Sequence, residues 1–548
     1  MNEPNSTGSA QSFLARTHDP RCVLRFARSA AAAAAFALLT AAIHAQPSVL
    51  QRGYNASATG ANLNETILNT SNVVSGTFGL VFKLPVVGSL YAQPLYVPRV
   101  AIPKRGMHNV VYVATMSDML YAFDADTAGP ALWRVNVADL VVASATPVPM
   151  SQFAFGGNRN IVGNLGILST PVLDASNNLM YVVACTLESD TMVYRLHAFD
   201  IRSGAEPLGP GVEISGNYGG QVFDARYVTQ RVSLTLADNQ VVFGFGAVEN
   251  EFPNAYTGWV MAYDKTTLIQ SGIFATITTS DNGGGVWQAG RPPVVGGGGD
   301  VYIFTGNGYT AGYNGVTNFS ESVLKLNPAK GLQLVDWFTP DNWSDMDSND
   351  QDLSSSGPMM IPGTQLLTGG GKTGILYILN DNKLGGFTSN DSGVVQEQQV
   401  AAEGLRGGPV YWQRSGGPLL YVWGAADALK AYPFTGTMIA TNPSAEGGNA
   451  TQLWPGGILA LSANGSQQGS GVLWANVVVS GNPKNGPPVP GALYAFDAGN
   501  VATELWDSTM NSSDSYGLFA KYVPPLVVNG KVYMATSSNQ LVVYGLLP

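Results

Sequence analysis

The chain has 548 residues, of which 45% are hydrophobic and only 12% are charged, and its formal net charge is −10 at pH 7. This negative charge disfavours nucleic acids and anionic membrane surfaces as partners. Glycine and proline are plentiful, with 65 and 32 residues. Such a composition suits many short strands joined by tight turns, so we expect an all-β fold.

Residues 1–45 have the pattern of an export signal. Arg21, Arg25 and Arg28 form a basic region, residues 30–43 form an apolar region, and Ala45 ends a plausible cleavage site. The apolar region is shorter than the roughly 20 residues that cross a bilayer, although an uncleaved membrane anchor is the alternative. We therefore expect a periplasmic or secreted monomer without a membrane span.

Few residues remain for disulfide, zinc or triad chemistry once this signal is removed. Cys22 lies within the signal, so Cys185 has no partner for an intrachain disulfide, and its apolar neighbours predict a buried thiol. His108 and His197 are the remaining histidines. They argue against histidine-rich zinc sites and leave little room for a Ser-His-Asp triad.

One four-strand unit recurs through the rest of the chain. In its clearest copy, four short runs rich in β-branched and aromatic residues span 93–97, 110–115, 120–124 and 132–137. A unit of this kind forms one antiparallel blade of a β-propeller. The third run occurs eight times, which predicts eight blades, at residues 120–124, 196–200, 260–264, 323–327, 376–380, 429–433, 493–497 and 541–545.

The eighth copy supplies only three strands, residues 524–528, 532–536 and 541–544. Residues 78–86 form an unassigned strand before the first blade, and we expect this strand to complete the eighth blade, because closing the ring hides both sheet edges. The propeller then spans residues 78–548. Residues 46–77 form a lead-in segment that we expect on its outside. Two separate β domains are the alternative.

The pattern Tyr-Val-Ala-Thr, Leu-Tyr-Ala-Phe-Asp and Leu-Trp within residues 112–133 resembles the repeat of the pyrroloquinoline quinone (PQQ) proteins. The resemblance covers nearly all of the chain from about residue 55. This superfamily of eight-bladed propellers includes quinoprotein alcohol dehydrogenases and cofactor-free scaffolds. In the dehydrogenases, PQQ lies on the propeller axis upon a tryptophan floor and is bound to a calcium ion. A similar fold cannot distinguish these functions, so they have to be distinguished by the residues of the site.

Four local patterns resemble the PQQ and calcium site of that family. Trp287 follows a Gly-Gly-Val sequence that resembles the strand carrying the floor tryptophan. Asn307 stands in a Thr-Gly-Asn sequence that resembles the turn from which the family supplies an amide oxygen to calcium. Lys372 begins a strand as does the basic residue that reaches the quinone oxygens, and Glu249 loosely matches a calcium-ligand glutamate. An aromatic platform, oxygen donors and an ammonium group suit a quinone with calcium.

Each of these residues also has a structural interpretation. Trp287 can be core packing, Asn307 a turn residue, Lys372 a solvated turn and Glu249 a surface acid.

Two departures from the family argue against an active dehydrogenase. The adjacent cysteine pair is absent from residues 143–165, and the catalytic aspartate has no clear counterpart, because residues 313–321 offer only Glu321 as an acid. Without a positioned carboxylate, alcohol oxidation lacks its general base. The acidic stretch 341–352 lacks the glycine and distal glutamate of a calcium loop, so we interpret it as a solvated loop.

These observations favour an exported ligand-binding or scaffold propeller with a degenerate quinoprotein-like axial pocket. One alternative is a PQQ- and calcium-dependent dehydrogenase that oxidises an alcohol or sugar. The other is a cofactor-free propeller that acts through contacts with a protein partner. The sequence assigns no catalytic residue.

Overall fold

The computed structural model describes residues 47–548 except residues 143, 154–159, 249–255, 280–282, 309–311, 450–451 and 485. The predicted export signal, residues 1–45, lies outside the described residues. Within the described part of the chain, no helix is long and apolar enough to cross a membrane.

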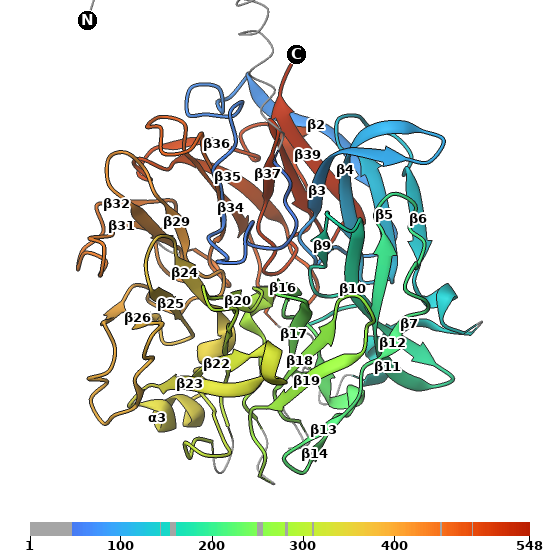
Figure 1. The fold of residues 1–548 in the computed structure, drawn as a ribbon. Coiled ribbons are helices and arrows are strands. Elements are labelled where there is room, and N and C mark those ends of the chain that lie inside the picture. Colours follow the sequence, from blue (N-terminus) through green and yellow to red (C-terminus); the bar gives the residue numbers. More distant parts are fainter. Residues whose placement is uncertain are drawn as a thin grey trace, which may run out of the picture. The chain divides into compact units, whose positions relative to one another are not determined.

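Eight sheets, each with four antiparallel strands at its centre, form the blades of the described chain, which confirms the predicted eight-bladed propeller (Figure 1). The first strands of successive blades contact one another, as β29, β33 and β37 do, so they are the innermost strands. From the axis outward, blades 1 to 4 are β3–β6 (Leu95–Ile102, Gly106–Ala114, Met119–Asp124, Trp133–Asn136), β9–β12 (Val172–Asp174, Leu179–Glu188, Thr191–Asp200, Val212–Glu213), β16–β19 (Thr235–Ala237, Gln240–Ala247, Trp259–Asp264, Gln270–Ala275) and β20–β23 (Val294–Val295, Val301–Phe304, Val323–Asn327, Gln333–Thr339).

The other four blades follow in chain order, and blade 8 takes its outermost strand from the start of the propeller. They are β24, β25, β26 and β28 (Met359–Ile361, Leu366–Gly370, Ile375–Asn380, Gln396–Gln399), β29–β32 (Val410–Trp412, Leu419–Val422, Leu429–Pro433, Ala445–Gly447), β33–β36 (Ile458–Ser462, Val472–Val478, Gly491–Asp497, Glu504–Asp507) and β37, β38, β39 and β2 (Leu526–Val528, Lys531–Ala535, Gln540–Leu546, Phe78–Pro85).

Further short elements decorate these blades. Five strands extend blades: β1 (Ala61–Asn62), β7 (Thr146–Pro149), β8 (Asn164–Leu165), β15 (Val228–Thr229) and β27 (Gly386–Phe387). A separate hairpin is formed by β13 (Asn217–Tyr218) and β14 (Gln221–Val222). The α-helices are α2 (Met150–Phe153) and α3 (Trp343–Ser348), and the 3-10 turns are η1 (Ala138–Leu140), η2 (Ala225–Tyr227), η3 (Gln288–Gly290), η4 (Pro328–Lys330), η5 (Leu353–Ser355) and η6 (Ser512–Asp514).

The hydrophobic core lies between the blades. Eight hydrophobic clusters each join residues of two neighbouring blades, as in the cluster that contains Tyr112 of blade 1 and Val182 of blade 2. A strand covered on both faces needs apolar residues at successive positions rather than at alternate ones. This requirement explains the continuous apolar run of β10, in which Leu179 to Thr186 are all buried.

The ring closes as predicted, through a strand from the start of the propeller. β2 pairs antiparallel with β39, from Phe78 opposite Leu546 to Pro85 opposite Gln540. Phe78 also packs edge-on against Trp506 of blade 7, with ring centroids 5.0 Å apart. The free edge that β39 would otherwise expose is thereby covered.

The lead-in segment does not lie outside the ring at residues 49–62, so that expectation is wrong there. Its backbone hydrogen-bonds to the innermost strands of six blades and Asn62 Nδ2 donates to Val527 O of blade 8 at 3.0 Å. The innermost strands have a free inner edge whose buried N–H groups need acceptors. The segment supplies them from the carbonyls of Val49, Leu50, Ala56, Ser57, Thr59 and Gly60.

Propeller topology gathers certain connections at one end of the axis. Successive strands of a blade run antiparallel, so the connections from second to third strands share an end with those from fourth strands to the next blade. We call this end the site face. Trp287 lies between β19 and β20, Asn307 between β21 and β22, and Lys372 between β25 and β26, so all three belong to it.

Candidate axial site

The Trp287 ring rests on a bed of three glycines. A Cβ atom at Gly246, Gly285 or Gly306 would lie 2.4, 2.4 or 2.6 Å from the nearest atom of the indole ring. The indole N–H donates to Ala247 O at 3.3 Å. The side chain is half-buried and packs partly against the core between blades 2 and 3. Trp287 therefore combines a packing role with a partly exposed aromatic ring.

Asn307 presents a buried amide oxygen without a partner. Its backbone N–H donates to Asp352 Oδ1 at 3.0 Å, and its carbonyl accepts the N–H of Gly284 at 2.8 Å. The residue is 4% exposed, and Asn307 Oδ1 has no hydrogen-bond partner among the described residues. A buried acceptor left in this state costs free energy, so a donor or a cation at this position would be favourable.

Lys372 is held by two carboxylates rather than standing free in solvent. Its ammonium group pairs with Asp350 Oδ1 at 2.5 Å and with Asp352 Oδ2. Burial acts to lower the pKa of Lys372, but Asp352 and Asp350 outweigh it and raise the pKa above its ordinary value. Lys372 therefore keeps its positive charge at neutral pH.

Asp352 joins these residues, although no sequence pattern predicts that it belongs with them. It is 4% exposed, accepts the Asn307 N–H and pairs with Lys372. A Cβ atom at Gly306 would lie 2.4 Å from Asp352 Oδ1 and 2.6 Å from the Trp287 ring, so the carboxylate and the indole are neighbours. The structure thus brings Trp287, Asn307 and Lys372 together around Asp352.

The interpretation of residues 341–352 as a solvated loop is therefore wrong at its inner positions. Asp347 accepts hydrogen bonds from Gly308 N at 2.8 Å and Ser320 Oγ at 3.0 Å, and burial raises its pKa to about 7. Asp341 and Asp345 remain exposed. The sequence does not distinguish the inward-facing acids from the exposed ones, because composition alone does not determine which carboxylates are buried.

The structure describes only one of the two remaining acids that the sequence offers as site candidates. Glu321 is fully buried; its Oε2 accepts the Leu353 N–H at 2.6 Å, and burial raises its pKa well above the ordinary value. This hydrogen bond ties Glu321 to the loop that bears Asp352. Glu249 lies outside the described residues.

Three arginines near this cluster form no ion pair with a described residue. Arg52, Arg231 and Arg406 make no ion pair within the described part of the chain. Arg52 donates to Ala289 O at 2.8 Å, two residues from Trp287, and burial lowers its pKa. The pKa of Arg406 is also lowered by burial, although Asp352 is among the groups that oppose this.

Aromatic rings partly shelter two of these cations. The Arg231 guanidinium lies 5.1 Å from the centre of the Tyr522 ring, and that of Arg406 lies 5.7 Å from the Trp454 ring. Cation–π contacts recover only part of the hydration that a buried charge loses. This end of the axis therefore contains three guanidinium groups that form no ion pair with a described carboxylate.

Comparisons with known proteins identify the fold alone. The sequence matches no protein-family model and no curated protein. A quinohemoprotein alcohol dehydrogenase from Pseudomonas putida HK5 is similar in structure, with a TM-score of 0.55 and 13% identity over 91% of this chain and 80% of that one. A quinohemoprotein alcohol dehydrogenase from Comamonas testosteroni is also similar, with a TM-score of 0.53 and 13% identity over 93% of this chain and 82% of that one. This chain shares their propeller architecture.

Proposed function

We propose that this protein is a ligand-binding propeller whose axial site holds PQQ together with calcium. The observation that carries the proposal is the convergence of Trp287, Asn307 and Lys372 around Asp352 at one end of the axis. These three residues were selected from sequence patterns that are 20 and 65 residues apart. A random set of turn residues in different blades has no reason to meet at one carboxylate.

The charge of the site supports an anionic ligand. PQQ is a planar tricarboxylate, and Arg52, Arg231 and Arg406 are cations without ion-pair partners in the described chain. Buried charges are stable when an opposite charge reaches them. Carboxylates of a bound ligand would supply that charge, and the half-buried indole of Trp287 would stack on the planar rings.

Oxygen donors at the site support a hard cation. Asn307 Oδ1 is buried and has no partner among the described residues, and amide and carboxylate oxygens are the ligands that calcium takes. Asn307 would supply one donor and the ligand's own carboxylate another. Glu249 remains a proposed further donor, as its sequence pattern suggests.

Asp352 favours a second candidate function, a dehydrogenase that acts on an alcohol or sugar. The argument against activity was the lack of an aspartate between the Asn turn and the next strand. Asp352 lies beyond that strand in the sequence, but its carboxylate accepts the Asn307 N–H at 3.0 Å, so the site contains an aspartate. Its carboxylate would accept the hydroxyl proton of the substrate. The Lys372 ammonium would stabilise negative charge on a quinone oxygen. Bound PQQ would supply the acceptor for two electrons.

A titration of the mature chain with PQQ in calcium chloride tests binding. We expect saturable changes in absorbance and a rise in melting temperature, because a ligand that binds only the folded state stabilises it by mass action. Trp287→Ala should abolish both. Trp337→Ala is the matched control, because Trp337 is also half-buried but lies on β23, the fourth strand of blade 4, away from the axis.

Dye-linked oxidation of ethanol and glucose then separates the two candidates. Activity that is lost in Asp352→Asn while PQQ still binds would establish the dehydrogenase. Binding without oxidation would establish the ligand-binding propeller. If saturating PQQ changes neither spectrum nor melting, the axial proposal is refuted and a propeller acting through protein contacts becomes the leading function.

Export remains a proposal that rests on residues 1–45 alone. The basic and apolar regions of this segment support cleavage after Ala45. N-terminal sequencing of the protein from periplasm and medium tests it, and an intact Met1 on the protein from the membrane fraction would contradict it.

A further inference from the structure

A small cavity lies at the propeller axis, between the lead-in segment and the ring. Residues 52–54 and Gly60 of the lead-in segment line one side, and residues at the starts of the innermost strands of blades 4, 6, 7 and 8 line the rest. The cavity has a volume of about 10 Å³, which is roughly the space that one water molecule or one monatomic ion needs. It is therefore too small for an organic ligand such as PQQ.

Two buried guanidinium groups line this cavity. Arg52 is 4% exposed and Arg291 is 5% exposed, and neither takes part in an ion pair within the described residues. Both side chains lie against glycines. A Cβ atom at Gly290 would lie 2.2 Å from Arg52 Nη1, and one at Gly408 would lie 2.6 Å from Arg291 Cδ. Larger residues at these two positions would displace the arginine side chains.

Backbone carbonyls satisfy only some of the arginine donors. Both hydrogen bonds from Arg52 to described residues start at Nη2, which donates to Ala289 O at 2.8 Å and to Tyr522 O. Arg291 Nη2 donates to Ala58 O at 2.6 Å, while the buried Nε of Arg291 has no acceptor among the described residues. Carbonyl dipoles do not neutralise a whole charge. The two cations therefore remain uncompensated by the described part of the chain.

The two cations are also close enough to repel each other. Burial lowers the pKa of Arg52, and the charges of Arg291 and Arg231 lower it further. Burial lowers the pKa of Arg291 to about 10, so this residue still carries its charge at neutral pH. An anion between the two guanidinium groups would offset this repulsion with two attractions.

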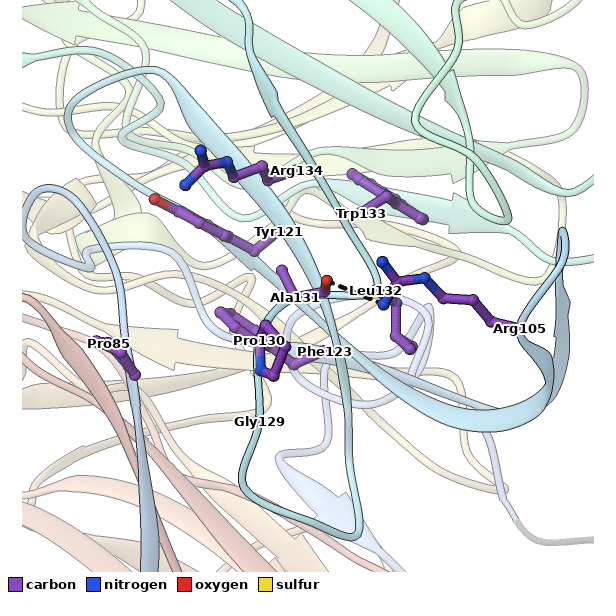
Figure 2. Close-up of a pocket in the computed structure, with 10 residues that line it drawn as sticks. All are labelled: Pro85, Arg105, Tyr121, Phe123, Gly129, Pro130, Ala131, Leu132, Trp133 and Arg134. Atoms are coloured by element: carbon purple, nitrogen blue, oxygen red, sulfur yellow. Dashed lines mark hydrogen bonds between the residues drawn. The ribbon is translucent and has the colours of Figure 1, made fainter.

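Exposed arginines elsewhere in the protein do not need such an anion. Arg105 and Arg134 line a hollow on blade 1 (Figure 2), and both are exposed, so water hydrates their charges. Burial removes that hydration at the axis. The axial pair of arginines therefore differs from the pair on blade 1 in its need for a counter-ion.

We propose that the axial cavity holds one chloride ion between Arg52 and Arg291. Chloride is a monatomic anion, so it matches the size of the cavity, and it can accept several N–H groups at once. A water molecule would fit as well, but it would leave both charges uncompensated. Arg52, Arg231 and Arg291 carry three positive charges, so one chloride ion leaves net positive charge for the ligand proposed at the site face.

Bromide tests the position of the ion, because it replaces chloride and scatters anomalously. Crystals of the mature chain, purified and grown in sodium bromide without PQQ, should show an anomalous peak between the Arg52 and Arg291 guanidinium groups. Since PQQ is absent, the result does not depend on the proposed function. A cavity without an anomalous peak in saturating bromide would overturn the proposal.

Stability in solution tests whether the ion is linked to folding. Urea unfolding is measured in mixtures of sodium chloride and sodium gluconate at constant ionic strength, so that screening stays the same. Gluconate is too large for the cavity. Above the dissociation constant, a tenfold increase in chloride should lower the unfolding equilibrium constant about tenfold, because the ion binds only the folded state. Equal stability in all mixtures would contradict the proposal.

Arg291→Met removes one charge while keeping a long side chain, so it should abolish both the bromide peak and the response to chloride. Arg134→Met is the matched control, because Arg134 is exposed and does not line the axial cavity. It should keep both signals. If Arg291→Met does not fold, the bromide map and the salt series of the unaltered protein decide the question. The proposal is refuted if Arg291→Met folds and responds to chloride as Arg134→Met does.

Discussion

Replacing Gly306 by alanine tests the central contact of the axial site. The added methyl group would lie 2.4 Å from Asp352 Oδ1, 2.6 Å from Trp287 Cζ3 and 2.9 Å from Ser354 Oγ. None of these atoms is the end of a free flexible chain, since Asp352 is paired and Ser354 Oγ donates to Gly285 O at 2.8 Å. The indole and the carboxylate must therefore move apart.

The expected cost follows from two opposing effects. Forcing a methyl group into a filled site costs about 1–3 kcal/mol. Alanine in place of glycine restricts the unfolded chain, which returns about 0.4–1 kcal/mol. We expect Gly306→Ala to lose about 1–2 kcal/mol of unfolding free energy. Gly298→Ala is the control: its Cβ would meet no atom within 4 Å, so only the stabilising effect applies.

Urea unfolding followed by fluorescence compares the two variants, and near-ultraviolet circular dichroism reports the packing of the indole. Gly306→Ala should unfold at lower urea than the unaltered protein, with an altered near-ultraviolet spectrum. It should also bind PQQ more weakly. If Gly306→Ala matches Gly298→Ala in midpoint and spectrum, Trp287 and Asp352 do not share a contact at Gly306, and the axial site as described is incorrect.

Three further outcomes follow from the structure. A chain that starts at residue 65 keeps β2 but loses the lead-in hydrogen bonds to the innermost strands, so it should melt well below a chain that starts at residue 47; equal melting would contradict their role. Burial, with Asp341 and Glu397 nearby, raises the pKa of Asp391 to about 7. Folding then favours the protonated carboxyl, so stability is lost as pH rises from about 4 to about 7, and Asp391→Asn should raise the melting temperature at pH 8 but not at pH 4. Arg406→Gln should leave the melting temperature of the ligand-free protein unchanged or raise it, and weaken PQQ binding about tenfold; lower stability with unaltered binding would assign Arg406 a structural role.

Local chemistry explains why the blades could be predicted from sequence. The acid that closes the third strand recurs because its carboxylate accepts backbone N–H groups two residues later. Asp124 Oδ1 accepts the Asp126 N–H at 2.8 Å, and Asp264 Oδ1 accepts the Thr266 N–H at 2.9 Å. Such turns need only neighbouring residues, so each copy of the repeat specifies its own strand boundaries. Ring closure could be predicted because residues 78–86 formed an unassigned strand at the start of the propeller, while the eighth blade lacked its fourth strand.

Contacts across the ring could not be predicted in the same way. Asp352 reaches Asn307 across 45 residues, and it lies in a run of acids whose composition is typical of a solvated loop. The polar lead-in segment also resembled surface, whereas residues 49–62 satisfy buried strand edges at the axis. In both cases the contacts join segments that are far apart in the sequence, and they exist only after the blades have assembled.

The distribution of charge gives the strongest physical reason to expect an axial ligand. Many acids of this chain serve local turns on the blades, as Asp124 and Asp264 do, while Arg52, Arg231 and Arg406 gather near the axis without ion pairs. Arg52 and Arg231 are buried and Arg406 is half-buried. Such cations reduce the stability of the ligand-free fold, because burial removes their hydration. Stability alone would favour replacing them with apolar residues. Their presence at the same end of the axis as the Asn307 oxygen, which has no partner among the described residues, is instead consistent with a folded state that is completed by an anion and a hard cation.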